Sequence, residues 1–267
     1  MYAFEYRKPG TLKDATALLR KTEDARAIAG GQSLLPAMRL RLSRSGTLVD
    51  LGALAELRGI TVVGTDVVIG AMTRHAEVAA SKDVNLLLPV LAKVAAGIGD
   101  QQVRNLGTLG GSLANNDPAA DYPAAALGLG ATIETNKRSI SADKFFTGMY
   151  ETALKPGELI VKVAFPMVKR AAYMKFRNPA SGYALVGVFV SEVAGHVRVA
   201  VTGATGCAFR VKAMEKALAT KFAPESVARI KVPAEELNTD LHATAEYRSH
   251  LITVMAQRAV EAALKGR

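Results

Sequence analysis

The sequence predicts an α+β protein in which two subdomains are followed by a smaller C-terminal α+β domain. Residues 1–170 mix short apolar segments typical of strands with segments of helical spacing. Residues 171–267 instead begin with alternating strand patterns and end in a long amphipathic segment. A chain of 267 residues with 49% hydrophobic positions can also bury the core that two or three such units need.

Residues 1–60 predict a compact α/β unit of strand, helix and strand that ends in a glycine turn. Thr11 can cap the first helix, whose apolar residues recur at helical spacing. Residues 25–29 are typical of a buried strand. A second helix is expected over residues 34–42, with Ser33 as its cap and Pro36 tolerated in its first turn.

The pattern of residues 61–170 predicts a second α+β subdomain. Its expected elements are a strand at 67–69, a helix near 73–80, a helix over 86–98, a glycine-containing loop over 107–112, a helix over 122–129 and a strand over 158–165. Pro166 then closes that strand.

Residues 171–267 predict a separate domain of antiparallel strands and helices. Two alternating segments, 183–193 and 196–201, flank a turn at Ala194-Gly195 and indicate a hairpin. A helix is expected over 210–219, and a terminal helix should place Leu251, Val254, Met255 and Ala262 on one face.

The cysteine and histidine content excludes several kinds of metal site. Cys207 is the only cysteine, so the chain itself cannot form a disulfide, a cysteine-ligated iron–sulfur cluster or a Cys-rich zinc site. The histidines show no metal-ligand spacing and are interpreted as ordinary core or surface residues: His75, His196, His242 and His250. No metal ligand is therefore predicted.

The net charge of +10 raises the alternative of a basic nucleic-acid-binding module. Its densest basic group, Arg39, Arg41 and Arg44, is interleaved with leucines, and solvated faces explain the charge more simply. No apolar run reaches the roughly 18 to 20 residues of a membrane-spanning helix, and the N-terminus lacks the features of a signal peptide. We therefore expect a cytoplasmic protein.

Two glycine pairs stand out, Gly30-Gly31 and Gly110-Gly111, each followed by hydroxyl or amide side chains. Glycine lets backbone amides approach phosphate oxygens closely, so two such turns could hold a diphosphate from both sides. Neither pair fits the G-x-G-x-x-G pattern or a P-loop, and a Rossmann or ATPase interpretation is not supported.

The segments around these pairs resemble the FAD-binding medium subunit of molybdenum hydroxylases, of the xanthine dehydrogenase and aerobic carbon monoxide dehydrogenase family. The likeness is strongest to the medium chain of carbon monoxide dehydrogenase. It rests on several motifs, in order along nearly the whole chain: AGGQSLLPAM, DVVIGAMTRHAE, RNLGTLGGSLAN with the following DPAADYP, PGELI, YMKFRNPASGYA and AEYRSHL.

This resemblance implies a fold and a cofactor. The fold is the two-subdomain FAD-binding type called PCMH or vanillyl-alcohol-oxidase-like, with non-covalent FAD held across residues 1–60 and 61–170, followed by the flavoprotein domain at 171–267. The implied FAD contacts are Ile28, Ala29, Gly30, Gly31, Gln32, Ser33, Leu34, Ile98, Thr108, Leu109, Gly110, Gly111, Ser112, Asp121, Ile160, Lys175 and Tyr183.

Three of these residues have more specific implied roles. Asp121 would meet the ribose or adenine side, and it is also well placed to cap a helix. Lys175 matches a lysine near the pyrimidine edge of the flavin, where a cation favours the reduced ring. Tyr183 matches a tyrosine that lies over the isoalloxazine. The plain alternatives are an exposed strand lysine and a strand aromatic.

The sequence also departs from the family pattern. Gly182 stands where relatives often carry an acidic residue, Asn178-Pro179 replaces a more basic pattern, and Ser112 replaces an asparagine. The first two changes bear on the choice of electron acceptor. We expect the Ser112 change to leave FAD binding intact, because neighbouring amides supply most contacts.

The implied function is electron transfer without substrate hydroxylation. A large molybdenum-cofactor subunit and a small iron–sulfur subunit would be the partners, in a dimer of heterotrimers, and this chain's FAD would reduce quinone, NAD or oxygen. The alternative is a self-contained FAD-dependent oxidoreductase of the same fold. The sequence shows no carboxylate–histidine substrate site that would favour that alternative.

Overall fold

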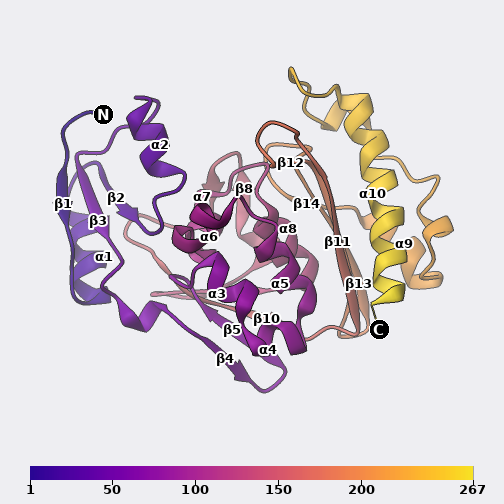
Figure 1. Ribbon diagram of the computed structural model, residues 1–267, viewed down its shortest axis with the longest axis horizontal. Coiled ribbons are helices and arrows are strands. Elements are labelled where there is room, and N and C mark those ends of the chain that lie inside the picture. Colours follow the sequence, from indigo (N-terminus) through magenta and orange to yellow (C-terminus); the bar gives the residue numbers. More distant parts are fainter. Residues whose placement is uncertain (267) are drawn as a thin grey trace.

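The computed structural model describes residues 1–266, in which three β-sheets follow one another along the long axis of the molecule (Figure 1). The first sheet is parallel, in the order β1 (Glu5–Arg7), β3 (Thr47–Asp50) and β2 (Ala25–Ile28). It carries α1 (Leu12–Lys21) and α2 (Leu34–Arg39). Thr11 caps α1 as predicted, because its side chain accepts a hydrogen bond from the amide of Asp14.

The second sheet is antiparallel and contains strands far apart in sequence. Its order is β4 (Ile60–Val63), β5 (Asp66–Gly70), β10 (Ile160–Pro166), β6 (Thr132–Thr135) and β7 (Ser139–Ser141). The connection between β5 and β6 holds the six helices α3 (His75–Ala80), α4 (Lys82–Leu87), α5 (Pro89–Ala96), α6 (Gln101–Leu106), α7 (Leu109–Asn115) and α8 (Asp121–Leu129). A small hairpin, β8 (Phe146–Gly148) and β9 (Glu151–Thr152), precedes β10.

The third sheet has the order β11 (Arg170–Arg177), β12 (Ala184–Val193), β13 (His196–Thr202) and β14 (Phe209–Arg210). The predicted hairpin is confirmed as β12 and β13. In Figure 1 the sheet stands between α8 on one side and α9 (Lys212–Thr220) and α10 (Ala245–Lys265) on the other. The segment 173–190 forms two extended pieces around a turn.

Several predicted elements were wrong in detail. The helix expected over 34–42 ends at Arg39, and Ser33 precedes it without a side-chain capping bond. The helix expected over 86–98 is two helices, α4 and α5, because Leu88 precedes Pro89 and adopts φ −139° and ψ 59°. The loop expected over 107–112 is largely the helix α7.

Apart from Ile60, which begins β4, and Arg170, which begins β11, each sheet lies within one of the three segments predicted as domains, 1–60, 61–170 and 171–267. That these segments are domains stays a prediction. Three apolar clusters accompany the sheets, and Phe189 and Ala200 of the third sheet belong to the cluster of the second. These two units therefore share a core.

Across residues 1–266, no helix is both long and apolar enough to cross a membrane. The same residues contain no group of three or more His, Cys, Asp or Glu side chains that could hold a metal ion.

Candidate functional site

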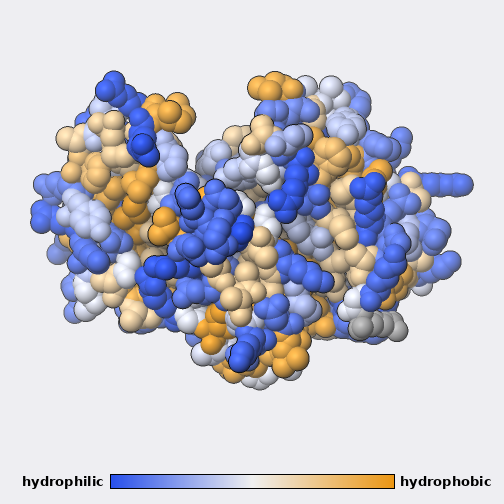
Figure 2. Space-filling view, viewed as in Figure 1, coloured by the Kyte–Doolittle hydropathy of each residue, from blue (hydrophilic) through white to orange (hydrophobic). Residues whose placement is uncertain are grey.

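A cleft separates the lobe of the first sheet from the rest of the molecule, and Figure 2 shows it as a notch in the upper edge. It contains a cavity of about 770 Å³, a size ordinary for a cofactor or small-molecule site. The cavity is lined from all three sheets by residues within 26–34, 51–75, 98–121, 154–160 and 175–183. Chain segments that are distant in sequence therefore meet at one site.

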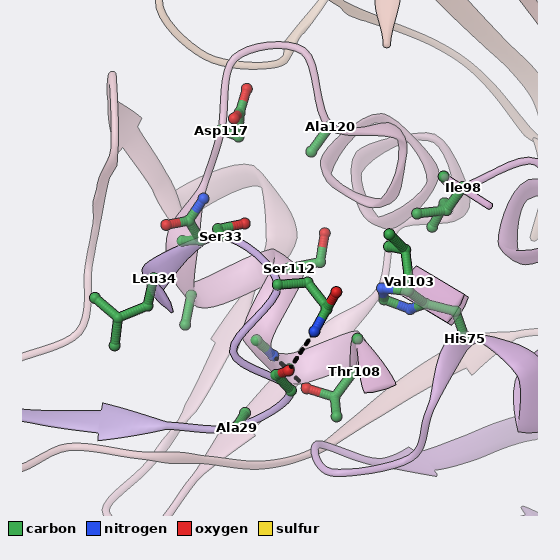
Figure 3. Close-up of a pocket in the computed structure, with 18 of the residues that line it drawn as sticks. Ala29, Ser33, Leu34, His75, Ile98, Val103, Thr108, Ser112, Asp117 and Ala120 are labelled. Carbon is green, nitrogen blue, oxygen red and sulfur yellow. Dashed lines mark hydrogen bonds between the residues drawn. The ribbon is translucent and has the colours of Figure 1, made fainter. Parts of the chain in front are cut away.

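One side of the cavity consists of two backbone segments, 29–34 and 107–112, which we call the glycine wall. Figure 3 shows Ala29, Ser33 and Leu34 on one side of the cavity and Val103 and His75 opposite them, with Thr108 and Ser112 between. The first segment turns sharply after β2, because Gly31 has φ +70°, a conformation that glycine adopts without strain.

The two segments of the glycine wall touch directly. A Cβ atom on Gly30 would lie 2.1 Å from the carbonyl oxygen of Leu106 and 2.7 Å from Cα of Gly107. A Cβ atom on Gly111 would lie 2.8 Å from Oγ1 of Thr108 and 3.4 Å from Cβ of Ala29. Glycine is therefore required at Gly30 because two backbones meet there.

The two segments differ in the state of their amides. Within residues 1–266, the amides of Gly30, Gly31, Gln32, Ser33 and Leu34 have no acceptor in the chain. In the second segment the amides are already bonded: Leu109 to Thr73, Gly110 to Ala71, Gly111 to the Thr108 hydroxyl and Ser112 to the Thr108 carbonyl. The sequence predicts that two glycine turns could hold a diphosphate from both sides. The amides of the second pair are already bonded within the chain, so this pair shapes the cavity by close packing.

The cavity lining also includes a buried ion pair between Asp121 and Lys175. We call this pair, together with its neighbour Tyr173 outside the lining, the charged wall. The Lys175 ammonium lies 2.8 Å from Oδ2 of Asp121 and donates also to the Gly97 carbonyl at 3.3 Å. The Tyr173 hydroxyl donates to Oδ1 of Asp121 at 2.5 Å. Both side chains of the ion pair are only 7% exposed, so Lys175 is not an exposed strand lysine.

Burial raises the pKa of Asp121, and the nearby Lys175, Tyr173 and Arg177 oppose that rise. Asp121 does not cap α8 as the sequence had suggested. It is the first residue of the helix, its cap position is Ala120, and its oxygens are taken by Tyr173 and Lys175. The negative carboxylate still lies at the positive end of the α8 dipole.

Tyr183 lies at the mouth of the cavity with 48% of its surface exposed. It follows a turn in which the Asn178 side chain accepts hydrogen bonds from the amides of Ala180 and Ser181. Gly182 has φ +71°, with open space around its missing side chain. The departure at Gly182 therefore has a backbone reason, since a left-handed conformation disfavours other residues there.

Nearly all the residues predicted to bind FAD line this one cavity. The exception is Leu109, whose side chain is fully buried in the core of the second unit. Ile98 and Ile160 line the cavity and also pack against that core. The role of each residue toward FAD stays a prediction. The separate places implied for Asp121, on the ribose or adenine side, and for Lys175, at the flavin, do not agree with their ion pair of 2.8 Å, which puts both at one end of the cofactor.

The sequence interpretation missed several residues of the cavity, including His75, Asp117 and Arg177. His75 and Asp117 lie in motifs that carried the family resemblance, but no chemistry was assigned to them. Burial, together with Arg104, lowers the pKa of His75 to about 4, so the imidazole is neutral at physiological pH. Its ring lies 5.3 Å from that of Tyr122, centroid to centroid.

Residues 2–168 match the family described as the FAD binding domain in molybdopterin dehydrogenase. Among curated proteins, the chain is 35% identical to the carbon monoxide dehydrogenase medium chain of Hydrogenophaga pseudoflava, over 97% of this chain and 96% of the relative. It is 36% identical to the nicotine 6-hydroxylase medium subunit of Paenarthrobacter nicotinovorans, with the same coverage.

The fold matches solved structures equally well. A chain of the Hydrogenophaga pseudoflava carbon monoxide dehydrogenase that lacks the Mo-pyranopterin moiety superimposes with a TM-score of 0.89 at 35% identity, covering 99% of this chain and 98% of that one. Quinoline 2-oxidoreductase from Pseudomonas putida 86 gives a TM-score of 0.89 at 32% identity, with the same coverage. The predicted α+β class is confirmed.

Proposed function

Because the chain belongs to the family of FAD binding domains in molybdopterin dehydrogenases, we propose that it carries electrons from a partner's iron–sulfur clusters through FAD to an external acceptor. It is an FAD-binding oxidoreductase subunit of the carbon monoxide dehydrogenase and xanthine dehydrogenase type. Quinone, NAD and oxygen are the proposed acceptors. Bound FAD supplies the two-electron chemistry, and the protein positions and tunes it.

The residues of the cavity fit a dinucleotide. The free amides of residues 30–34 can donate to phosphate oxygens without breaking a bond inside the chain. Apolar surface at Leu34, Ile98 and Ile160 can cover ring faces and exclude water. Tyr183 stands at the mouth, where its ring can shield one face of the flavin.

The observation that carries the proposal is the row of unbonded amides in the first glycine segment. FAD added to the purified chain should bind non-covalently at about one per chain, and acid treatment should release it unchanged. Replacing Gly31 by valine should sharply weaken this uptake, because φ +70° and the Leu35 side chain 2.9 Å from the new Cβ leave no relaxed conformation. Gly111→Val should act similarly by displacing Thr108 and Ala29. Wild-type protein that takes up no flavin would contradict the proposal.

For the assembly, we infer a complex with a large molybdenum-cofactor subunit and a small iron–sulfur subunit, as a dimer of heterotrimers. The support is that similar proteins are named medium chains or medium subunits, and that a single cysteine cannot ligate a cluster. Native purification should yield three chains with iron and molybdenum, at twice the heterotrimer mass by light scattering. A lone chain that oxidises a small substrate would instead support a self-contained FAD oxidoreductase.

The cytoplasmic location expected from the sequence stays a prediction. Cell fractionation followed by immunoblotting of this chain would test it.

A further inference from the structure

The ion pair of the charged wall has a third member that does not reach the cavity. Tyr173 is partly buried and is absent from the cavity lining, yet its hydroxyl donates to the oxygen of Asp121 that Lys175 does not use. The Asp121 carboxylate is thus held at both oxygens, by an ammonium on one side and a phenol on the other. Hydrogen bonds to a charged acceptor are the strong ones, and they fix its orientation.

The neighbouring strand leaves room for this contact. Gly187 pairs with Lys175 in the β11–β12 register. A Cβ atom on Gly187 would lie 2.2 Å from the Tyr173 hydroxyl oxygen. The Tyr173 ring therefore crosses β12 at a residue without a side chain and reaches α8, and it lies 6.2 Å from the ring of Phe189.

We propose that Tyr173 is a positioning residue that acts through Asp121 to set how much of the Lys175 charge faces the bound flavin. This inference rests on the proposed FAD site. Lys175 and Asp121 both line the cavity, and together they present an ion pair rather than a free cation. The charge sensed in the cavity depends on how firmly the carboxylate is held against the ammonium.

The direction of the effect follows from charge. Reduced FAD carries more negative charge on its ring than oxidised FAD, so a less neutralised Lys175 favours the reduced form. Without the Tyr173 hydroxyl, the Asp121 carboxylate loses a bond that stabilises its ionised state and becomes easier to protonate. Tyr173→Phe should therefore raise the midpoint potential of the bound flavin.

The test compares midpoint potentials of FAD-loaded variants at one neutral pH. Asp121→Asn should increase the preference for reduced over oxidised FAD about tenfold, which is about 30 mV for a two-electron couple. Tyr173→Phe should increase it about threefold, or about 15 mV. The double variant should match Asp121→Asn alone, because Tyr173 acts only through that carboxylate.

Tyr122→Phe is the matched control. Tyr122 is fully buried beside Asp121 on α8, and its hydroxyl has no hydrogen-bond partner within residues 1–266. This variant should keep the wild-type potential. Gly187→Ala should displace the Tyr173 hydroxyl and raise the potential without removing the tyrosine. A wild-type potential in Tyr173→Phe, or additive shifts in the double variant, would overturn the inference.

A flavin-free measurement separates this inference from the proposed function. The ionisable groups that face Asp121 are Tyr173, Lys175 and Arg177 from β11, Tyr122 on α8, and Tyr183. In protein labelled with carbon-13 at aspartate, the Asp121 carboxyl should titrate at a higher pH in Tyr173→Phe than in wild type. Titration at the same pH would overturn the positioning role, whether or not FAD binds. A failure of wild type to take up FAD, with the titration shift present, would contradict only the proposed function.

Discussion

The glycine wall and the charged wall face the same cavity but are built from different parts of the chain. The glycine wall presents backbone, and its contact between Gly30 and Leu106 leaves no room for one added carbon atom. The charged wall presents side chains in a buried network, in which Asp121 is bonded to both Tyr173 and Lys175. The first kind of wall is sensitive to added volume, and the second is sensitive to the loss of a bonding partner.

This difference separates two properties of one site. Free amides can hold a diphosphate in any redox state of the cofactor, so the glycine wall should control affinity. A buried ion pair changes the relative stability of two charge states, so the charged wall should control potential. Variants of single residues in each wall can therefore test whether affinity and potential are controlled separately.

The largest effect on FAD binding is expected at Gly30. Replacing it by alanine places a carbon 2.1 Å from the Leu106 carbonyl oxygen and forces the two glycine segments apart. FAD affinity should fall on the order of a hundredfold, equivalent to about 2.8 kcal/mol. The dissociation constant of FAD can be measured by titration of the flavin fluorescence. Gly10→Ala is the control, because nothing lies within 4 Å of a Cβ at Gly10. Equal affinities in the two variants would refute the tight contact.

The next prediction concerns the pH dependence of stability, which His75 should influence. His75 packs against the glycine wall, and a Cβ atom on Gly107 would lie only 2.6 Å from its Nε2 atom. Its pKa is lowered to about 4 in the folded chain, whereas an unfolded histidine titrates near pH 6.5. As the pH is lowered, the imidazole of the unfolded chain is protonated before that of the folded chain. The free energy of unfolding should therefore decrease by roughly 3 kcal/mol between about pH 6.5 and about pH 4.

Denaturant unfolding at a series of pH values measures this slope. His75→Phe should reduce the number of protons taken up on unfolding by about one over that range, because phenylalanine cannot be protonated. The dependence of the unfolding free energy on pH should become correspondingly weaker. An unchanged slope in the variant would show that His75 is not buried in its neutral form, and that the glycine wall is open to water there.

A smaller effect is expected for Lys175→Met on the charged wall. Loss of the ammonium should lower the midpoint potential of bound FAD. The change in preference between the two redox forms should stay below about tenfold, or about 30 mV, since the raised pKa of Asp121 lets that carboxyl take up a proton in compensation. Lys169→Met is the control, because Lys169 pairs with Glu192 on the surface. A large loss of FAD affinity in Lys175→Met would mean that the charged wall anchors the cofactor as well.

The smallest effect on binding is expected for Tyr183→Ala. A half-exposed aromatic at the mouth contributes about 0.5 to 1.5 kcal/mol beyond buried area, so FAD should stay bound with altered absorbance and altered reactivity toward acceptors. Tyr183→Phe keeps the ring and should preserve the spectrum. An unchanged spectrum in the alanine variant would remove Tyr183 from the flavin site.

Local sequence patterns determined much of the fold of this protein. The Thr11 cap and the β12–β13 hairpin follow from signals that neighbouring residues carry, and both occur as predicted. The strand expected over 25–29 forms as β2, but it was wrongly predicted to be buried, because its residues are partly or fully exposed. Nearly every residue that the family motifs implied for FAD binding lines the cavity, although more than half of the lining was not predicted. These features are readable in sequence because hydrophobic period, caps and turn residues act over a few positions.

Tertiary structure alone decided what those residues do at the cavity. Gly110 and Gly111 are typical of a loop, but α7 forms there because Thr108 caps it and Gly110 packs on Ala71, far away in sequence. Lys175 looked like a free cation until β11 brought it to Asp121 on α8. The charge state of the Asp121–Lys175 pair, the burial of His75 and the free amides of residues 30–34 all depend on contacts between segments that are distant in sequence. A local sequence pattern contains no information about such contacts.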